Sequence, residues 1–406
     1  MPKLLRGEVT PPSSKSQCHR EIICAALAHG ESRLKNIYFS DDINATLRGV
    51  SALGAEFIRE SDTLRITGGM ATAVPSIDCG AAATTLRLLL PAALALYGEA
   101  NFTGAPSLMS RPLEPYFRLF RERGIEYELN DNCLRVRGRL LAGEYALPGD
   151  VSSQFFSGLL LALPLARRDT SLHVRGAVST PYLDMTLDTA ARFGIEISQR
   201  DYEEFYIPGR QRYRSTYFSI EGDWSAAAML LVAGATAGEV TVRNASMLSK
   251  QADTAICTAL VRAGAAVINE EDSVTALHRP LRAFEFDATN CPDLFPALAA
   301  LAAAADGVSV IRGTSRLEYK ECNRSEAIRE EYAKLGIEVD TSEEDLMKIR
   351  GGKVRAARTQ SHGDHRMAMS LAVAALRSDE AVEIEGAESV AKSYPGFFGD
   401  LEHIRV

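Results

Sequence analysis

Apolar residues recur at helical spacing in five stretches of the chain, and each stretch ends in glycine followed by an apolar residue. The stretches read LRGVSALGAEF, FRLFRERGIEY, LDTAARFGIEI, CTALVRAGAAV and REEYAKLGIEV. Their glycines are spaced by 70, 70, 70 and 72 residues and are Gly54, Gly124, Gly194, Gly264 and Gly336. Glycine just past a helix end adopts the left-handed C-cap conformation at little cost. The pattern therefore predicts five amphipathic helices, each ended by glycine and followed by a strand.

A second series consists of nearly all-apolar helices, each headed by a small or polar residue. Spacings of 68, 69, 72, 68 and 72 residues separate these heads, which are Ser16, Thr84, Ser153, Ser225, Asp293 and His365. Two independent series with one period indicate an internal repeat. We predict six copies of one unit, each with a buried helix, a strand, an amphipathic helix and a hairpin such as YELNDNCLRVRG.

The two ends of the chain complete this arrangement. The sixth copy ends at YPGFFGDLEHIRV without a full hairpin, whereas the N-terminal KLLRGEVT is a predicted strand without a helix of its own. We infer that this strand joins the sixth copy, which places both termini in one domain. The predicted domains are 14–222, with copies one to three, and 1–13 plus 223–406, with copies four to six. Two chain crossings between lobes favour a hinge with a ligand cleft between the lobes.

Composition narrows the class of protein. The 406 residues are 46% hydrophobic and 24% charged, as in ordinary globular proteins. The net charge of -8 argues against binding to nucleic acid through the phosphate backbone. Seven scattered cysteines without a CxxC pair indicate free thiols. With no signal-peptide pattern and no apolar run long enough to span a membrane, we expect a cytoplasmic monomer.

Cations at the predicted helix starts point to an anionic ligand. Lys15 and Arg20 stand among serines at the first buried helix, in PPSSKSQCHR. Helix N-termini carry partial positive charge, so cations placed there fit an anion that arrives from outside the chain. Cations recur at equivalent points of later copies, at Arg111, Lys320, Arg324, Arg366 and Lys392. The arrangement predicts a substrate with several anionic groups.

Each of these residues also has an ordinary structural interpretation. Ser152 and Ser153 could be N-caps, and Asp364 is placed to cap the helix that follows it. Lys320 and Arg324, four apart, could lie on a solvated helix face. Only their recurrence at matching points of a repeat favours binding over these alternatives.

A metal site is a further alternative for HGDHR. His362, Asp364 and His365 are residue types that ligate metals, but no further ligand follows them at a suitable spacing. We therefore expect no metal.

Nine motifs resemble one enzyme family. They read SSKSxxxR, GxxxTTxR, SRP, DVSSQFFSGLLLALP, PYLDMTL, PDLFPALAALA, KExxR, GDHRMAM and AKSYPGFF. In this order, from residue 13 to residue 398, they resemble the 5-enolpyruvylshikimate-3-phosphate (EPSP) synthases, or 3-phosphoshikimate 1-carboxyvinyltransferases. The resemblance implies an α/β fold of two pseudo-symmetric lobes, each of three βαβαββ repeats. It also implies transfer of the enolpyruvyl group of phosphoenolpyruvate (PEP) to the 5-hydroxyl of shikimate 3-phosphate, in chorismate biosynthesis, without a metal or organic cofactor.

The resemblance further implies which residues form the site. Asp293 matches the family's proton acceptor, and Glu321 and Lys15 match groups implicated in proton transfer, with their order left open. The residues implied for shikimate 3-phosphate are Lys15, Ser16, Arg20, Ser152, Ser153, Gln154, Ser179, Tyr182, Asp293, Arg316 and Lys320. Those implied for PEP are Lys15, Ala83, Arg111, Gln154, Arg324, Arg366 and Lys392.

The chain departs from the family pattern at two places. Ala81–Ala83 stand where the family usually has Asn-(Ser/Ala)-Gly, so a methyl group at Ala83 should crowd the PEP pocket. We expect weaker binding of glyphosate, which fills that pocket, and a higher KM for PEP without the asparagine. The family's KE(S/T)DR reads KECNR here, and the neutral Asn323 predicts that Arg324 is held less firmly.

Two other functions remain open at this point. The related enolpyruvyl transferases acting on UDP-N-acetylglucosamine usually carry a reactive cysteine in a loop of the second repeat. The corresponding TGAPSLMSRPLEP has none. Alternatively, the alanines and Asn323 could mark a degenerate paralogue that binds anions without turnover, although the charged residues Lys15, Asp293, Glu321, Arg366 and Lys392 are all present.

Overall fold

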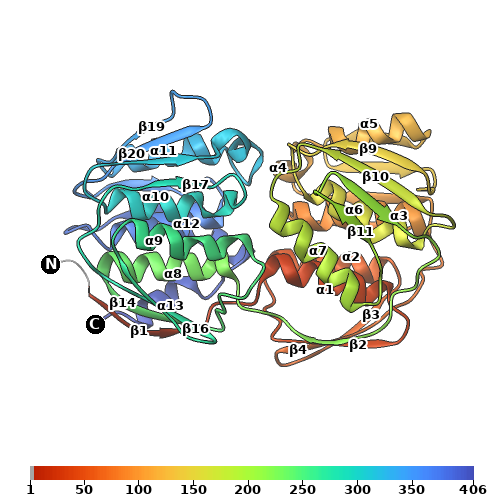
Figure 1. Cartoon of the computed structure of the whole chain (residues 1–406), viewed down its shortest axis with the longest axis horizontal. Coiled ribbons are helices and arrows are strands. Elements are labelled where there is room, and N and C mark those ends of the chain that lie inside the picture. The colour runs from red at the N-terminus through yellow and green to blue at the C-terminus, as the bar shows by residue number, and fades with distance from the viewer. Residues whose placement is uncertain (1–3) are drawn as a thin grey trace. The chain divides into compact units, whose positions relative to one another are not determined.

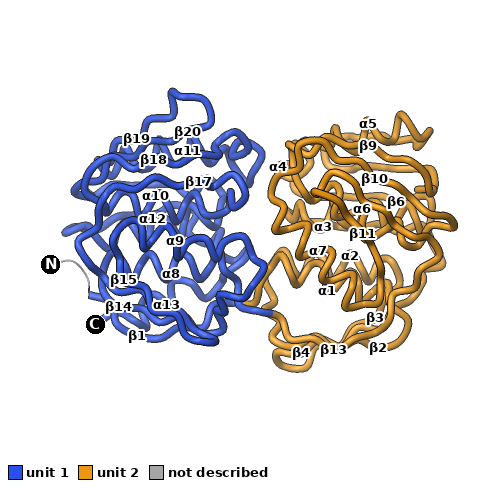
Figure 2. Tube along the Cα trace, viewed as in Figure 1, with its two compact units in different colours: residues 1–12, 221–406 blue, residues 13–220 orange. Residues whose placement is uncertain are grey.

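A computed structural model describes residues 4–406, which divide into two compact units (Figure 2). Unit 2 is Ser13–Ile220, and unit 1 combines the described residues up to Pro12 with Glu221–Val406. Each unit has its own hydrophobic core.

Unit 2 contains three repeats of one pattern (Figure 1). The first repeat is α1 (Lys15–Leu27), β2 (Glu31–Lys35), α2 (Asp41–Ala52), β3 (Glu56–Glu60) and β4 (Thr63–Thr67). The second is β5 (Ser76–Asp78), α3 (Ala83–Leu96), β6 (Glu99–Thr103), α4 (Pro106–Met109), α5 (Glu114–Arg123), β7 (Glu126–Asn130) and β8 (Cys133–Arg137). The third is β9 (Glu144–Pro148), α6 (Gln154–Ala162), β10 (Thr170–Arg175), α7 (Thr180–Arg192), β11 (Ser198–Arg200) and β12 (Glu204–Ile207).

Unit 1 repeats the pattern, with a shortened last copy. Its first copy follows β13 (Tyr217–Ser219) and is α8 (Trp224–Ala237), β14 (Gly238–Arg243), α9 (Ile256–Arg262), β15 (Ala266–Asn269) and β16 (Ser273–Leu277). The next is β17 (Glu285–Asp287), α10 (Phe295–Ala303), β18 (Val308–Arg312), the 3-10 helix η4 (Thr314–Tyr319), α11 (Arg324–Lys334), β19 (Glu338–Asp340) and β20 (Leu346–Arg350). The last is β21 (Arg358–Gln360), α12 (His365–Ala375), β22 (Glu383–Glu385), the 3-10 helix η5 (Ala387–Lys392) and α13 (Phe397–His403).

The sheets show how the repeats are linked. In most repeats the strand that enters the buried helix pairs in parallel with the strand that leaves it, as β5 does with β6. Two strands are exchanged: β13, which leads into α8, pairs with β2, and β1 (Leu5–Val9), which leads into α1, pairs with β14. Each exchanged strand therefore completes a sheet in the repeat that lacks its own entering strand.

This exchange corrects the predicted place of the N-terminal strand. The sheet order is β1-β14-β16-β15, so β1 belongs to the fourth repeat and not to the sixth. The sixth repeat reaches β1 through the single bridge Leu5–Arg405. In the fourth repeat, β1 occupies the place of the entering strand because that repeat's own entering strand, β13, pairs with β2 instead.

The predicted glycine caps are confirmed. All five glycines have positive φ, from 65° at Gly124 to 97° at Gly54. At Gly54 a side chain is also excluded by space, because a Cβ atom would lie 2.3 Å from the backbone nitrogen of Ala71.

Within each unit, the polar heads of the buried helices come together. Asp293, just before α10, contacts Arg366 of α12 in unit 1, and Gln154 of α6 contacts Thr84 of α3 in unit 2. Two helix heads therefore lie together inside each unit taken by itself. Over residues 4–406, no helix combines the length and apolar character needed to cross a membrane.

Candidate functional site

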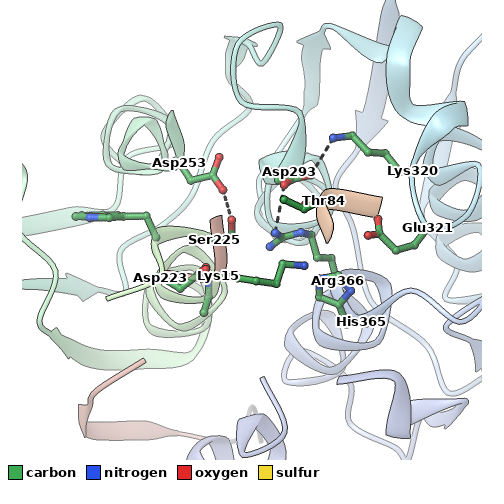
Figure 3. A network of polar contacts seen from close by, with 12 residues as sticks. Lys15, Thr84, Asp223, Ser225, Asp253, Asp293, Lys320, Glu321, His365 and Arg366 are labelled. Atoms are coloured by element: carbon green, nitrogen blue, oxygen red, sulfur yellow. Dashed lines mark hydrogen bonds and ion pairs between the residues drawn. The ribbon is translucent and has the colours of Figure 1, made fainter. Parts of the chain in front are cut away.

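Asp293 is the centre of an ionic cluster in unit 1 (Figure 3). Its Oδ1 accepts from Lys320 Nζ at 3.1 Å and from Arg324 Nη1 at 2.8 Å. Its Oδ2 accepts from Arg366 Nη2 at 3.2 Å. Burial raises the pKa of Asp293, but the charges of Lys320, Arg366 and Arg324 outweigh it and hold the pKa well below its usual range. Asp293 is therefore an ionised carboxylate held by three cations.

Arg324 is the most deeply buried of these cations. It begins α11, its side chain is 1% exposed, and its Nε donates to Asp364 Oδ2 at 2.7 Å. Its Nη2 donates to Glu321 Oε2, also at 2.7 Å. Burial lowers the pKa of Arg324, yet the carboxylates of Asp364, Glu321 and Asp293 raise it well above its ordinary value. Arg324 therefore stays charged.

The expectation that Arg324 is held less firmly is wrong. The Asn323 side chain caps α11, accepting from the backbone nitrogen of Glu326 at 3.3 Å. Three carboxylates, from Asp293, Glu321 and Asp364, bind the guanidinium. Asn323 thus replaces the family's acidic residue in a capping position, where Asn and Asp serve equally well.

Asp364 caps α12, as predicted, by accepting from the backbone nitrogen of Arg366 at 2.8 Å. The Arg366 side chain is 6% exposed, and its Nε is buried without a hydrogen-bond partner among the described residues. Burial lowers the pKa of Arg366, but the carboxylates of Asp293, Asp223 and Asp253 together raise it above its ordinary value. A charged guanidinium with an unused N–H beside Asp293 is suited to bind an anionic ligand.

Asp253 did not stand out in the sequence. It is 3% exposed, and Ser225 Oγ at the start of α8 donates to its Oδ2, whereas its Oδ1 has no partner among the described residues (Figure 3). Burial and the nearby Asp293 charge raise the pKa of Asp253 to about 7. Its position in the repeat could have identified it, because Asp253 precedes the amphipathic helix of its repeat as Ser179 and Lys320 precede theirs.

The remaining predicted residues of unit 1 lie on the elements around this cluster. Burial lowers the pKa of Lys320, which follows η4, although Asp293 acts against this. Arg316, within η4, donates from Nη2 to the carbonyl of Thr289 at 2.5 Å. Lys392 is half-buried at the end of η5.

In unit 2, Lys15 is the first residue of α1, behind the N-cap Ser14. Its Nζ donates to Asp42 Oδ2 at 2.9 Å, with both side chains at most 12% exposed. Asp42, at the start of α2, did not stand out in the sequence. The pair joins the first two helices of the repeat at their N-terminal ends.

Arg20 is a buried cation whose hydrogen bonds within the described chain all go to neutral groups. It is 1% exposed and donates to Thr186 Oγ1 at 2.7 Å, the Ser16 carbonyl at 2.8 Å, the Tyr182 carbonyl at 3.3 Å and Ser157 Oγ at 3.4 Å. Burial lowers its pKa to about 10. A buried guanidinium held only by neutral groups is favourably placed to receive the carboxylate of a ligand.

Gln154, at the start of α6, links two helix heads. Its Nε2 donates to Thr84 Oγ1 at 2.9 Å, and its Oε1 accepts from Arg87 Nη1 at 3.0 Å. Ser152 Oγ accepts from the Gln154 backbone nitrogen at 3.3 Å, as a cap would. Ser153 occupies the N-cap position, but its side chain makes no capping hydrogen bond. The capping interpretation therefore fits Ser152 and not Ser153.

Three further predicted residues of unit 2 have separate surroundings. Ser179 precedes α7 with φ of 57° and is 3% exposed. Arg111 lies between α4 and α5. Ala83 is the first residue of α3 and is 8% exposed, so its methyl group lies in the protein at a helix N-terminus.

Comparison with known proteins identifies the family. The sequence profile of EPSP synthase (3-phosphoshikimate 1-carboxyvinyltransferase) matches residues 1–401. The chain belongs to the EPSP synthase family. It is 40% identical over 415 residues to 3-phosphoshikimate 1-carboxyvinyltransferase of Clostridium perfringens strain SM101, covering 99% of this chain and 97% of that protein. It is 39% identical over 412 residues to the protein of that name from Clostridium acetobutylicum, with coverage of 99% and 96%.

Solved structures agree with this assignment. The EPSP synthase of Acinetobacter baumannii superposes with a TM-score of 0.83 at 26% identity, covering 100% of this chain and 97% of that one. The enolpyruvyl transferase NikO of Streptomyces tendae shares the fold, with a TM-score of 0.78 at 19% identity over 99% and 95% of the two chains. The predicted α/β fold of βαβαββ repeats is thereby confirmed as that of the EPSP synthases.

Proposed function

We propose that this EPSP synthase transfers the enolpyruvyl group of PEP to the 5-hydroxyl of shikimate 3-phosphate, which yields EPSP and inorganic phosphate. The step belongs to chorismate and aromatic amino-acid biosynthesis. The observation that carries the proposal is the Asp293 carboxylate held by Lys320, Arg324 and Arg366. We further propose that the enzyme acts as a cytoplasmic monomer.

The reaction requires a base and a proton donor. The 5-hydroxyl attacks C2 of PEP and loses its proton, while C3 of PEP gains one. The resulting tetrahedral intermediate then loses a proton from C3 and expels phosphate. We assign the base to Asp293 and the proton transfer at C3 to Glu321 and Lys15.

Substrate charge would convert Asp293 into a base. With three cations around it, its pKa is too low for efficient proton abstraction. A phosphate that engages Lys320, or PEP that engages Arg366, would compete for these cations and raise the pKa of Asp293 toward its working range. Proton abstraction would therefore follow the arrival of the anions.

The other predicted residues would bind the two substrates. Hydroxyl groups at helix starts and a buried guanidinium suit the phosphate and carboxylate of shikimate 3-phosphate, and for these we propose Ser16, Arg20, Ser152, Ser153, Gln154, Ser179, Tyr182, Arg316 and Lys320. A cage of cations suits PEP and stabilises the departing phosphate, and for this we propose Lys15, Arg111, Arg324, Arg366 and Lys392, with Ala83 and Gln154 beside them.

Phosphate release tests the proposed reaction. The purified protein is given shikimate 3-phosphate and PEP together, and then each alone, and free phosphate is measured. We expect release only with both substrates and a rate at least about 100-fold lower for Asp293→Asn. Replacing shikimate 3-phosphate by UDP-N-acetylglucosamine should abolish release. Saturable binding of shikimate 3-phosphate without release would instead identify a paralogue that does not turn over.

A further inference from the structure

We propose that Glu331, together with His362, is a positioning residue that fixes the backbone before Arg366 and thereby places Arg366 for PEP. The proposal rests on the proposed function. Glu331 lies in α11 and is fully buried, at 0% exposure. It does not touch Arg366 itself, so any effect on PEP must pass through residues 360–364.

Glu331 binds this segment at two points. Its Oε2 accepts from the backbone nitrogen of Gln360 at 2.9 Å, and its Oε1 makes a 2.7 Å hydrogen bond with His362 Nε2. Lys334 Nζ donates to both carboxylate oxygens, at 2.8 and 2.9 Å, from a side chain that is 46% exposed. Burial raises the pKa of Glu331, but Lys334, His362 and the Gln360 N–H lower it below its usual value, so the carboxylate is ionised.

The segment has a conformation that needs such support. His362 has φ of 54°, a left-handed value that is strained for a residue other than glycine. Gly363 follows with φ of 68°. Ser361 Oγ donates to the carbonyl of Gly386 at 2.8 Å and fixes the other side of the turn. The hydrogen bond to Glu331 gives the strained His362 a buried partner.

Arg324 holds the far end of the same segment. It lies seven residues before Glu331, two turns away on the same face of α11. Arg324 binds Asp364, and Glu331 binds Gln360 and His362, so one face of α11 holds the segment at both ends. Asp364 then caps α12 through the backbone nitrogen of Arg366, whose guanidinium reaches Asp293.

The three groups Glu330, Glu331 and His362 also lie within 4.8 Å of one another, as metal ligands could. Both oxygens of Glu331 already accept hydrogen bonds from Lys334, and one also accepts from the Gln360 N–H. These contacts account for the cluster without an ion, so we assign it to positioning.

Steady-state kinetics of Glu331→Gln test the proposal. Glutamine keeps the shape but loses the charge and one acceptor oxygen. Because a small displacement of a binding group costs one to two orders of magnitude, we expect KM for PEP to rise about tenfold while KM for shikimate 3-phosphate changes less than about twofold. The matched control is Lys334→Met, which removes another partner of Glu331 but does not touch residues 360–364. It should leave both KM values unchanged.

A second variant distinguishes the positioning role from a folding defect. His362→Asn tolerates the left-handed conformation but is too short to reach Glu331, and it should raise KM for PEP in the same direction. In the double variant the two effects should be less than additive, because both break one contact. Equal rises in both KM values, or a lower unfolding free energy with unchanged KM for PEP, would overturn the proposal.

Calorimetric titration with PEP in the presence of shikimate 3-phosphate separates this failure from that of the proposed function. If the wild-type protein binds PEP without turnover, Glu331→Gln should still weaken PEP binding about tenfold. Unchanged PEP affinity in that variant would refute the positioning role whatever the activity of the wild type.

Discussion

Arg324 and Asp364 form a buried ion pair, with 2.7 Å between Arg324 Nε and Asp364 Oδ2 and side chains 1% and 0% exposed. The pair joins the first residue of α11 to the N-cap of α12. Because Arg324 also binds Asp293 and Glu321, the pair fixes one side of the acidic and basic cluster from which the proposed chemistry follows.

Asp364→Asn should therefore cost stability. Asparagine still caps α12, but the buried Arg324 loses one of its counter-charges, so we expect a loss of roughly 3 kcal/mol in the free energy of unfolding. Urea denaturation measures it. Asp379→Asn, at an ion pair whose aspartate is 54% exposed, is the control and should change stability by less than about 1 kcal/mol. Similar losses of unfolding free energy in the two variants would show that the buried ion pair stabilises the protein no more than the exposed one does.

Asn323→Asp restores the acidic residue usual in the family and should change little. The side chain caps α11, the hydrogen bonds of the Arg324 side chain go to Asp293, Glu321 and Asp364, and Asp and Asn are equivalent caps. We expect KM for PEP to stay within about twofold, whereas Asn323→Ala should lower the unfolding free energy by about 1 kcal/mol through loss of the cap. A large gain in PEP affinity in the aspartate variant would mean that position 323 acts on Arg324 after all.

Ala83→Gly should increase sensitivity to glyphosate. The variant removes a methyl group from the first residue of α3, at the proposed PEP pocket. We expect at least about tenfold stronger inhibition at fixed PEP, together with a loss of up to about 1 kcal/mol of stability from glycine at a helix start. Inhibition curves at several PEP concentrations give the inhibition constant. Sub-micromolar inhibition of the unaltered protein at low PEP would contradict the prediction.

Asp253 should make stability depend on pH. Its pKa of about 7 in the folded protein exceeds the value near 3.9 of an unfolded chain. Between pH values of about 4 and 7, the folded state therefore binds more protons at Asp253 than the unfolded state does. The stabilisation from protonated Asp253 is complete below about pH 4 and is lost as pH rises through 7. Asp253→Asn removes the effect, so its melting temperature relative to wild type should rise by about 2 °C or more from pH 5 to pH 8. A constant difference would show that Asp253 ionises normally.

The repeat and its helix ends could be predicted because both are local. Glycine at position 54 or 124 directly indicates a left-handed backbone at a helix end. A polar residue before an apolar helical stretch likewise indicates where that helix begins. The place of β1 could not be predicted, because its pairing depends on β13 being taken by β2, about 180 residues away in the chain. Strand exchange leaves no mark in either strand's own sequence.

The site divides in the same way. Cations such as Lys320 and Arg366 stood out because they recur in the repeat, but their partners did not. Asp42 and Asp253 are ordinary acidic residues in sequence and gain meaning only from burial beside Lys15 and Ser225. The error over Arg324 had the same origin, because Asp364 binds it from forty residues further along the chain.

Phosphorus NMR of one reaction mixture tests the central claim most directly, because it follows PEP, shikimate 3-phosphate, the new phosphomonoester and free phosphate together. We predict that PEP and shikimate 3-phosphate disappear in equal amounts as the phosphomonoester and phosphate appear, and that Asp293→Asn, folded as judged by its melting curve, slows all four changes at least about 100-fold. Phosphate formed from PEP while the shikimate 3-phosphate signal stays constant would contradict enolpyruvyl transfer.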